Sequence, residues 1–290
     1  MKRFAIAGSL AAALAVAGLA GATAFAGPGK PGKLARPSAK SLPPVVGQVN
    51  FTSGCAFSHT APDDPIVYPG VPGASHQHSF VGNRSTNAAS TLASLQAAAT
   101  SCRRQADKAA YWMPTLYRSG QPIQPTGATV YYRRGTKAPV KPFPLGLKII
   151  AGSSMATTPQ SLQVTFWSCG VEDSGPSSTV PTCPDAGPRS LRLHVRFPEC
   201  WDGTSLDSSD HKSHMAYAVR RMCSATHPVS VPAIAMIFKY PIDGGPNVVL
   251  ASGGQYSGHA DFFNAWDPAV LAGLVDFCLN GLRHCGPLGP

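Results

Sequence analysis

Residues 191–197 have the sequence LRLHVRF, in which apolar and polar side chains alternate strictly. Successive side chains of an extended strand point to opposite faces of a sheet, so the alternation predicts a strand with one buried and one exposed face. Strands of this kind are typical of antiparallel sheets, which pack one face on a core and leave the other toward solvent. The stretch therefore indicates an antiparallel β protein.

Other β-rich runs, bounded by turn residues, agree with this prediction. They are residues 129–132, 147–151, 163–167 and 233–240. Strands do not alternate regularly with helices, as a parallel α/β fold would require. The pattern predicts a mainly β chain: an antiparallel sandwich or jelly-roll-like single domain with a few short helices and several disulfides.

Two segments have the pattern of helices. Residues 87–104 carry leucine and alanine at helical spacing. Residues 269–279 follow Asp267, a favourable N-cap residue, and Pro268, which suits a first helical turn. We expect a helix in each segment.

The first residues have the pattern of an export signal. Lys2 and Arg3 precede a small, apolar run that ends in Ala24-Phe25-Ala26, a small-x-small cleavage site. This predicts a signal peptide over residues 1–26 and a secreted, extracellular mature chain without a membrane segment. The alternative is an uncleaved anchor, because the apolar run approaches the roughly 17–25 residues that span a bilayer.

The remainder divides into a tether and a domain. Residues 27–49 are rich in Pro, Gly and Lys and predict a flexible basic linker. Residues 50–285 are long enough for one β-rich domain with its own core. The net charge is +10, but the basic residues are dispersed. Dispersed charge argues against a nucleic-acid partner and is compatible with an anionic wall polymer or with solubility alone. We expect a monomer.

Eight cysteines in an exported chain predict four disulfides. Sequence alone leaves the connectivity open. Proximity favours four pairs: Cys169–Cys183, Cys200–Cys223, Cys278–Cys285 and, by remainder, Cys55–Cys102. A zinc cluster is the alternative, but the chain contains no Cys-x-x-Cys.

Three short stretches place a histidine beside another proton-carrying or metal-binding side chain: residues 75–78, 210–214 and 258–261. Imidazole can donate, accept or ligate near neutral pH. His76 and His78 point to the same side of an extended segment. His259 and Asp261 share a face in the same way, and the carboxylate suits fixing the imidazole tautomer. The competing interpretation is that these groups only hold loops together.

The stretch at residues 210–214 is flanked by residues that suit a helix start. His211 and His214 would share a helical face, and Tyr217 beside His214 is a candidate acid/base partner. The spacing of Gly70, His76 and His78 imitates half of a cupin motif, but no glutamate follows at the expected distance.

Aromatic residues next to carboxylates suggest sugar contacts. Glu199, Trp201 and Asp202 follow the strand expected at 191–197. Tyr111 and Trp112, which are consecutive in the sequence, add two more aromatic rings. Exposed rings suit sugar stacking, whereas buried rings belong to a core. The chain lacks a Gly-x-Ser-x-Gly elbow, a phosphate-binding P-loop and a His-Glu-x-x-His motif.

The order of motifs resembles the secreted domain-of-unknown-function family number nineteen ninety-six, in its actinobacterial-type form. The motifs are Asp64-Pro65-Ile66-Val67, His76-x-His78, Tyr111-Trp112-x-Pro114, Phe197-Pro198-x-Cys200-Trp201-Asp202-Gly203, His214-Met215-Ala216-Tyr217 and His259-Ala260-Asp261-Phe262-x-Asn264-x-Trp266. The resemblance implies an extracellular, wall-associated protein with a β-rich fold. It supplies no established activity.

These observations favour a carbohydrate-active enzyme, a hydrolase or a lyase, on cell-wall or extracellular polysaccharide. The candidate catalytic residues are His76, His78, His214, His259 and Asp261. The candidate substrate contacts are Asp64, Tyr111, Trp112, Trp201, Asp202, Tyr217 and Asn264. For hydrolysis, Asp64 would pair with Asp202 or Asp261.

The sequence leaves the identity of a cofactor open. Three imidazoles and a carboxylate suit a divalent metal such as zinc, copper or nickel, with His76, His78, His214 and His259 as candidate ligands. The alternatives to an enzyme are a non-catalytic wall- or glycan-binding module and a structural exoprotein.

Overall fold

A computed structural model describes residues 49–170 and 175–286. The expected signal peptide and all of the expected linker except Val49 lie outside the described residues. The described residues belong to one compact unit. None of the helices among them is long and apolar enough to cross a membrane.

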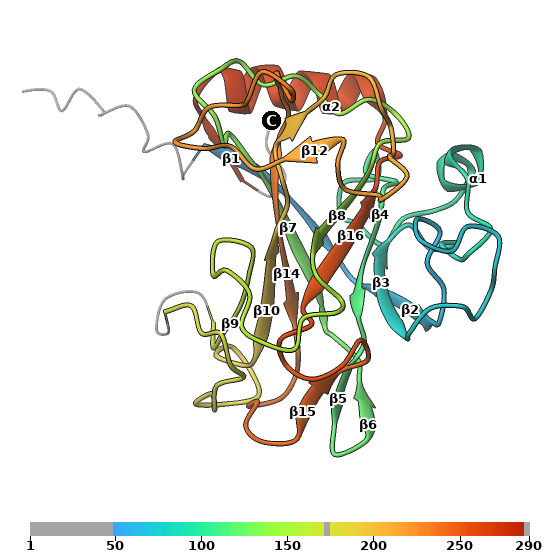
Figure 1. The fold of residues 1–290 in the computed structure, drawn as a ribbon, viewed down its shortest axis with the longest axis vertical. Coiled ribbons are helices and arrows are strands. Elements are labelled where there is room, and N and C mark those ends of the chain that lie inside the picture. The colour runs from blue at the N-terminus through green and yellow to red at the C-terminus, as the bar shows by residue number, and fades with distance from the viewer. Residues whose placement is uncertain (1–48, 171–174, 287–290) are drawn as a thin grey trace, which may run out of the picture. The chain divides into compact units, whose positions relative to one another are not determined.

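Two sheets form the framework of this unit (Figure 1). The five-stranded sheet is antiparallel throughout and has the order β2 (Phe57–Ala61), β3 (His78–Gly82), β4 (Ala110–Pro114), β16 (His259–Phe263), β8 (Lys148–Gly152). The six-stranded sheet has the order β17 (His284–Cys285), β1 (Asn50–Cys55), β7 (Gly127–Arg133), β14 (Ala233–Lys239), β10 (Arg192–Arg196), β9 (Thr165–Ser168). Only the short β17–β1 pair among these strands is parallel.

The remaining elements are short. One small sheet contains β12 (Met215–Ala216), β11 (Cys200–Trp201) and β13 (Val229–Ser230), and the other contains β15 (Val248–Leu250), β5 (Leu116–Arg118) and β6 (Gln121–Ile123). The helices are α1 (Leu92–Ala97), α2 (Pro268–Leu274) and the π-helical turn η2 (Val275–Asn280) that continues α2. Figure 1 shows α1 beside β3 and α2 across one end of the sheets.

The main core lies between the two large sheets, as in a sandwich. Each strand contributes alternate residues to it: Val130 and Tyr132 from β7, and Tyr111 and Met113 from β4. Phe262 of β16 also belongs to this cluster. The prediction of a mainly β, antiparallel sandwich is therefore confirmed.

The stretch at residues 191–197 behaves as its alternation predicts. Leu193 and Val195 of β10 are fully buried, while Arg192, His194 and Arg196 are half-buried on the opposite face. The four other predicted runs also contain strands, namely β7, β8, β9 and β14.

The predicted helices have different outcomes. Asp267 accepts hydrogen bonds from the N–H groups of Ala269 and Val270, so α2 begins as expected. The helix expected over residues 87–104 is wrong in extent, because α1 is only six residues long, Leu92–Ala97. Its last part is extended, since Cys102 is bridged to β1 by a disulfide and by a β-bridge to Cys55.

Four disulfides join Cys55–Cys102, Cys169–Cys183, Cys200–Cys223 and Cys278–Cys285. These are the pairs that proximity favours, and no free cysteine remains among the described residues. The zinc-cluster alternative is therefore excluded.

A polar network crosses the sandwich core. Asp107 is fully buried and accepts hydrogen bonds from the Tyr111 hydroxyl at 2.8 and 2.9 Å. Tyr111 also contacts the Tyr132 hydroxyl from the opposite sheet, and the Trp266 indole N–H donates to Tyr132 at 2.8 Å. Burial raises the pKa of Asp107 to about 7, although hydrogen bonds from Ser53 and Tyr111 oppose the shift.

Asp107 should make stability depend on pH. Its folded-state pKa lies above the unfolded value of 3.8, so its stabilising contribution is complete below about pH 4 and disappears as the pH rises to about 7. We expect Asp107→Asn to remove a slope of up to about 1.4 kcal/mol per pH unit from the unfolding free energy in this window. Urea unfolding of both proteins from pH 4 to 8 measures it. If the unfolding free energies of the wild type and of Asp107→Asn changed in parallel with pH, this role of Asp107 would be contradicted.

The five-stranded sheet is covered on both faces. Its second face packs Phe80 of β3, Trp112 of β4 and Phe263 of β16 against Ile66 and Leu95. Ile66 belongs to the segment between β2 and β3, and Leu95 belongs to α1, between β3 and β4. Side chains at alternate positions share a face. His78, His259 and Asp261 therefore also lie on this second face.

Candidate functional site

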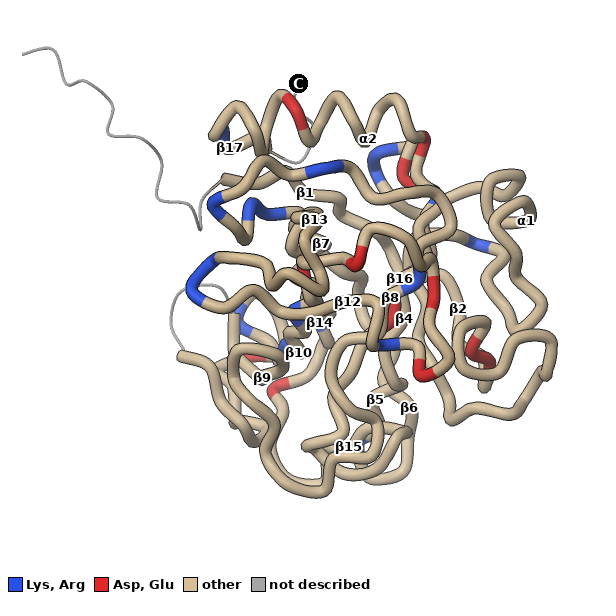
Figure 2. Tube along the Cα trace, turned by 45° about the horizontal axis from the view of Figure 1, so that its top comes forward, with Lys and Arg blue, Asp and Glu red and all other residues tan. Residues whose placement is uncertain are grey.

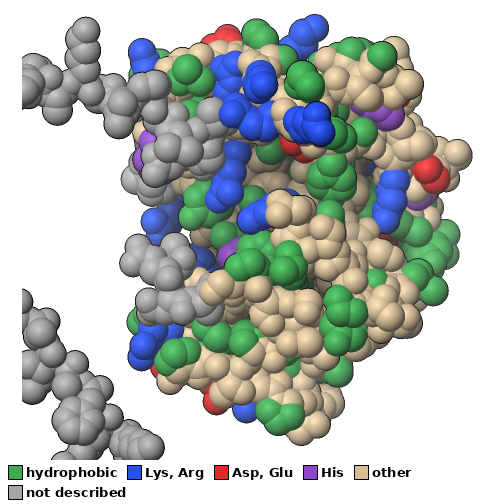
Figure 3. Space-filling view, turned by 60° about the vertical axis from the view of Figure 1, so that its left-hand side comes forward, with side chains coloured by type: hydrophobic (Ala, Val, Ile, Leu, Met, Phe, Trp, Pro, Cys, Tyr) green, Lys and Arg blue, Asp and Glu red, His purple; other side chains and the backbone are tan. Residues whose placement is uncertain are grey.

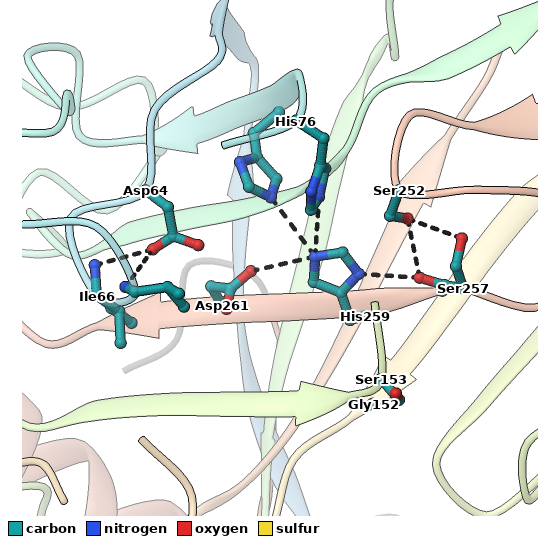
Figure 4. A network of polar contacts seen from close by, with 12 residues as sticks. Asp64, Ile66, His76, Gly152, Ser153, Ser252, Ser257, His259 and Asp261 are labelled. Atoms are coloured by element: carbon teal, nitrogen blue, oxygen red, sulfur yellow. Dashed lines mark hydrogen bonds and ion pairs between the residues drawn. The ribbon is translucent and has the colours of Figure 1, made fainter. Parts of the chain in front are cut away.

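Three histidines converge on the second face of the five-stranded sheet. His259 Nε2 lies 3.2 Å from His76 Nε2 and 3.5 Å from His78 Nε2. His78 begins β3, His259 begins β16, and His76 ends the loop that enters β3. Figure 4 shows both upper rings pointing down at His259. We call these residues the histidine cluster.

Backbone contacts fix the tautomers of two of these rings. His78 Nδ1 bonds to the carbonyl oxygen of Asp63 at 3.0 Å, and His259 Nδ1 bonds to that of Ser257 at 2.9 Å. A carbonyl only accepts, so each Nδ1 carries the proton and each Nε2 presents a lone pair. Two lone pairs thus face each other across 3.5 Å, an arrangement that a cation between them would stabilise.

The spacing fits one tetrahedral metal ion. Zinc–imidazole bonds of about 2.0–2.1 Å at tetrahedral angles place two ligand nitrogens roughly 3.3 Å apart. The two nitrogen–nitrogen distances, 3.2 and 3.5 Å, lie on either side of this value. One ligand atom from each of the three histidines lies within 4.8 Å of those of the other two. The three imidazoles could therefore hold one metal ion.

Two carboxylates adjoin the cluster. Asp261 Oδ2 lies 4.0 Å from His259 Nε2, and both Asp261 oxygens are buried without a hydrogen-bond partner. Asp64 Oδ1 accepts from the N–H groups of Ile66 and Val67 at 2.8 and 3.0 Å. Asp64, His78 and Asp261 form a second group with ligand atoms within 4.8 Å. In Figure 4 the other Asp64 oxygen points toward Asp261.

Burial dominates the electrostatics of the site. It lowers the pKa of His259 to about 3 and, with the charges of His76 and His259, holds the pKa of His78 well below its usual range. Burial, and then the charge of Asp64, holds the pKa of Asp261 well above its usual range. The imidazoles are therefore neutral at physiological pH. No lysine or arginine of the described residues forms an ion pair with Asp64 or Asp261.

A tied loop positions His76 and Asp64. Asp63 Oδ1 accepts from the Gly73 N–H at 2.9 Å, and Asp63 Oδ2 accepts from the Ala88 N–H at 3.2 Å. The Ser75 N–H donates to the Pro62 carbonyl at 3.1 Å, which closes the loop just before His76. The site is therefore built from a sheet face and a loop with many fixed contacts.

A comparison with protein families shows to which family the chain belongs. The profile of the family described as "Domain of unknown function (DUF1996)" matches residues 64–266. The chain belongs to the DUF1996 family. The match begins at Asp64 and includes the whole histidine cluster and Asp261. No curated protein and no solved structure matches this chain.

His214 is not brought into the cluster of this DUF1996 domain. Its Nε2 donates to the Lys148 carbonyl at 2.7 Å, and its Nδ1 bonds to the Ser208 hydroxyl at 2.9 Å. Both ring nitrogens are thus occupied in holding a loop. His211 bonds instead to the Asp207 carboxylate at 2.9 Å. The structure therefore does not bring His214 together with the other expected catalytic and metal-binding histidines.

Most of the expected sugar contacts lie elsewhere in the DUF1996 domain. Tyr111 is buried in the sandwich core, and Asn264 is buried where its amide donates to the Pro144 carbonyl at 2.8 Å. Asp202 Oδ1 accepts from Thr204 and Ser205 in a turn, so it does not pair with Asp64.

The other aromatic candidates divide between the site and the surface. Trp112 is fully buried directly opposite Asp261 in the β4–β16 pair, so it forms part of the floor beneath the cluster. Trp201 is half-buried and donates to the Ser205 carbonyl at 2.7 Å. Tyr217 is 42% exposed and donates to the Arg196 carbonyl.

Two contributors to the site have no clear sequence signal. Asp63 acts through its backbone carbonyl and through loop contacts, although its place beside Asp64 between two prolines is typical of a turn. Lys212 donates to the Gly152 carbonyl at 2.7 Å, and its charge lowers the pKa values of His259 and Asp261. It is a cation near the site that only the tertiary structure reveals.

Proposed function

We propose that this DUF1996 domain is a metal-dependent enzyme in which His76, His78 and His259 hold one divalent transition metal ion, zinc being the first candidate. The observation that carries the proposal is the pair of facing Nε2 lone pairs on His78 and His259, with His76 completing the set. Three protein ligands with a remaining open position are typical of catalytic zinc sites.

The residues around the cluster have distinct tasks in this proposal. A divalent cation held by the three imidazoles would supply a nucleophile, since it would lower the pKa of a bound water toward neutrality. The same cation would favour the ionised form of Asp261, 4.0 Å from His259 Nε2, and this carboxylate would accept the proton of the attacking water. Asp63 and Ser257 hold the imidazoles in the ligating tautomer. His76 is the half-buried member, so substrate approaches from its side.

We infer that the substrate is an extracellular polysaccharide and that the chain is an exported, actinobacterial-type member of its family. Four disulfides and the export pattern of the first residues support export. The loop between Asp64 and His76 exposes Tyr68 and Val71, by 42% and 53%, which offers an apolar rim for a sugar ring. Hydrolysis is the favoured chemistry.

Removal of the metal tests the proposed function. We expect a chelator to abolish cleavage of the polysaccharide, and one equivalent of zinc to restore cleavage. Chromatography of products from a panel of wall polysaccharides measures hydrolysis, and ultraviolet absorption of unsaturated ends detects elimination instead. Full activity after verified metal removal would overturn the metal dependence. Saturable glycan binding with bound metal but without product would favour the glycan-binding module.

A further inference from the structure

The outer face of the six-stranded sheet carries a second concentration of functional groups. The polar residues of β10, Arg192, His194 and Arg196, all lie on this face. In the register of the sheet Arg192 is opposite Lys239 of β14, and His194 is opposite Phe166 of β9. This face lies on the other side of the sandwich from the histidine cluster. Figure 2 shows Lys and Arg positions along β10 and β14.

Three adjoining hollows make this face a groove. The first, of about 540 Å³, is lined by Arg103, Tyr131 and Lys239. The second, of about 270 Å³, shares Tyr131 and Lys239 with it and adds Arg133, Arg192 and Arg196. The third, of about 450 Å³, shares Arg133 and Arg196 with the second. We call the continuous channel the basic groove. Figure 3 shows Lys and Arg side chains gathered on this side of the molecule.

The cations of the basic groove have few carboxylates near them among the residues that the structure describes. Among residues 49–170 and 175–286, no carboxylate forms an ion pair with Arg103, Arg133, Arg192, Arg196 or Lys239. Glu199, in the third hollow, is the one described carboxylate that lines the groove.

Two of the guanidinium groups also have unused donors. The Nε groups of Arg133 and Arg192 are buried and have no acceptor among the described residues. A buried donor without an acceptor is costly, so a side-chain shift that lets either Nε donate to a ligand would be favoured. The charge of Arg196 also lowers the pKa of Arg133 after the larger effect of burial, which indicates crowding of like charges.

The aromatic rings of the groove hold the guanidinium groups in place. Arg133 lies over Tyr131 at 4.7 Å, and Arg196 lies over Phe166 at 5.0 Å. Phe166 also stacks on His194 at 4.3 Å. A stacked guanidinium leaves its N–H edge available for a carboxylate, which it binds through two parallel hydrogen bonds. Rings already covered in this way are poor platforms for nucleobases, which need an open aromatic face.

We propose that the basic groove binds an acidic polysaccharide chain, with guanidinium forks on the carboxylates of successive uronate sugars. The site is independent of the histidine cluster and of the proposed enzyme activity. It would hold an anionic polymer on one face of the sandwich whether or not that polymer is the substrate.

The test compares two polymers and two double variants of the full chain. Isothermal titration should show saturable binding of polygalacturonate and at least about tenfold weaker binding of its methyl-esterified form, because esterification removes the carboxylates. Arg133→Gln/Arg196→Gln should weaken polygalacturonate binding at least about tenfold. The control Arg118→Gln/Arg189→Gln removes the same amount of charge outside the groove, from cations that are paired with Asp243 and Asp185. Its affinity for polygalacturonate should equal that of the wild type.

Three results would overturn the proposal. They are equal binding of both polymers, equal loss of binding in both double variants, and tighter binding of single-stranded DNA, which would assign the groove to nucleic acid. Circular dichroism checks that each variant is folded. His259→Ala should bind polygalacturonate like the wild type, so failure of the groove proposal and failure of the metal proposal give different results.

Discussion

Replacing His259 with alanine should raise the dissociation constant for zinc by at least about a hundredfold. His259 Nε2 is the atom common to both short nitrogen–nitrogen contacts, so its loss leaves His76 and His78 without their shared partner. Changes to residues that only orient ligands typically cost 10–100-fold in metal affinity, and loss of a ligand should cost more. Zinc titration of metal-free protein by calorimetry, with a competing chelator, measures the change.

His227→Gln is the matched control for this experiment. His227 lies outside the histidine cluster: its Nε2 donates to the Ser213 carbonyl, and its Nδ1 contacts the Thr226 hydroxyl. We expect its zinc affinity to equal that of the wild type. A similar loss in both variants would show that the metal does not depend on the histidine cluster.

Replacing Asp261 with asparagine should lower the turnover rate by about 10²–10⁴-fold, the range typical of a lost general base. Asparagine keeps the size of the side chain but accepts protons poorly. The buried Asp261 oxygens make no hydrogen bond, so the change should not disturb a structural contact. Zinc affinity should stay within about tenfold of the wild type, because the three imidazoles remain.

Asp202→Asn separates the two carboxylates that the sequence offers as partners of Asp64. Asp202 accepts from two backbone N–H groups in a turn, a role that asparagine can also fill. Its turnover should be unchanged. If Asp202→Asn is as slow as Asp261→Asn, or if Asp261→Asn keeps full turnover, Asp261 is not the base.

The fold follows largely from local patterns. The alternation at residues 191–197 predicts the buried face of β10, and Asp267 with Pro268 predicts the start of α2, because both signals act within a few residues. The prediction of a helix over residues 87–104 fails in its last part, because the pairing with Cys55, far away in the sequence, imposes an extended backbone at Cys102. A long-range covalent link overrides helix propensity there.

The site follows from the sequence only in part. Residues two apart on an extended segment share a face, so the sequence itself predicts that His259 lies near Asp261 and His76 near His78. Their meeting depends on β4 lying between β3 and β16, which no local pattern gives for residues 183 apart. His214 is not brought to the cluster, because Ser208 of its own loop and the Lys148 carbonyl of β8 occupy its two ring nitrogens.

The basic residues illustrate the same limit. Along the chain they are dispersed, and the sequence indicates no binding stripe. The pairing of β10 with β14, and of β14 with β7, assembles Arg192, Arg133 and Lys239 on one sheet face. Their concentration is a property of strand order rather than of sequence clustering.

Diffraction from zinc-loaded crystals at the zinc absorption edge tests the central claim most directly. The account predicts one anomalous peak about 2.0–2.1 Å from the Nε2 atoms of His76, His78 and His259. A zinc ion held by other residues, or these three imidazoles hydrogen-bonded to one another with no peak between them, would contradict it.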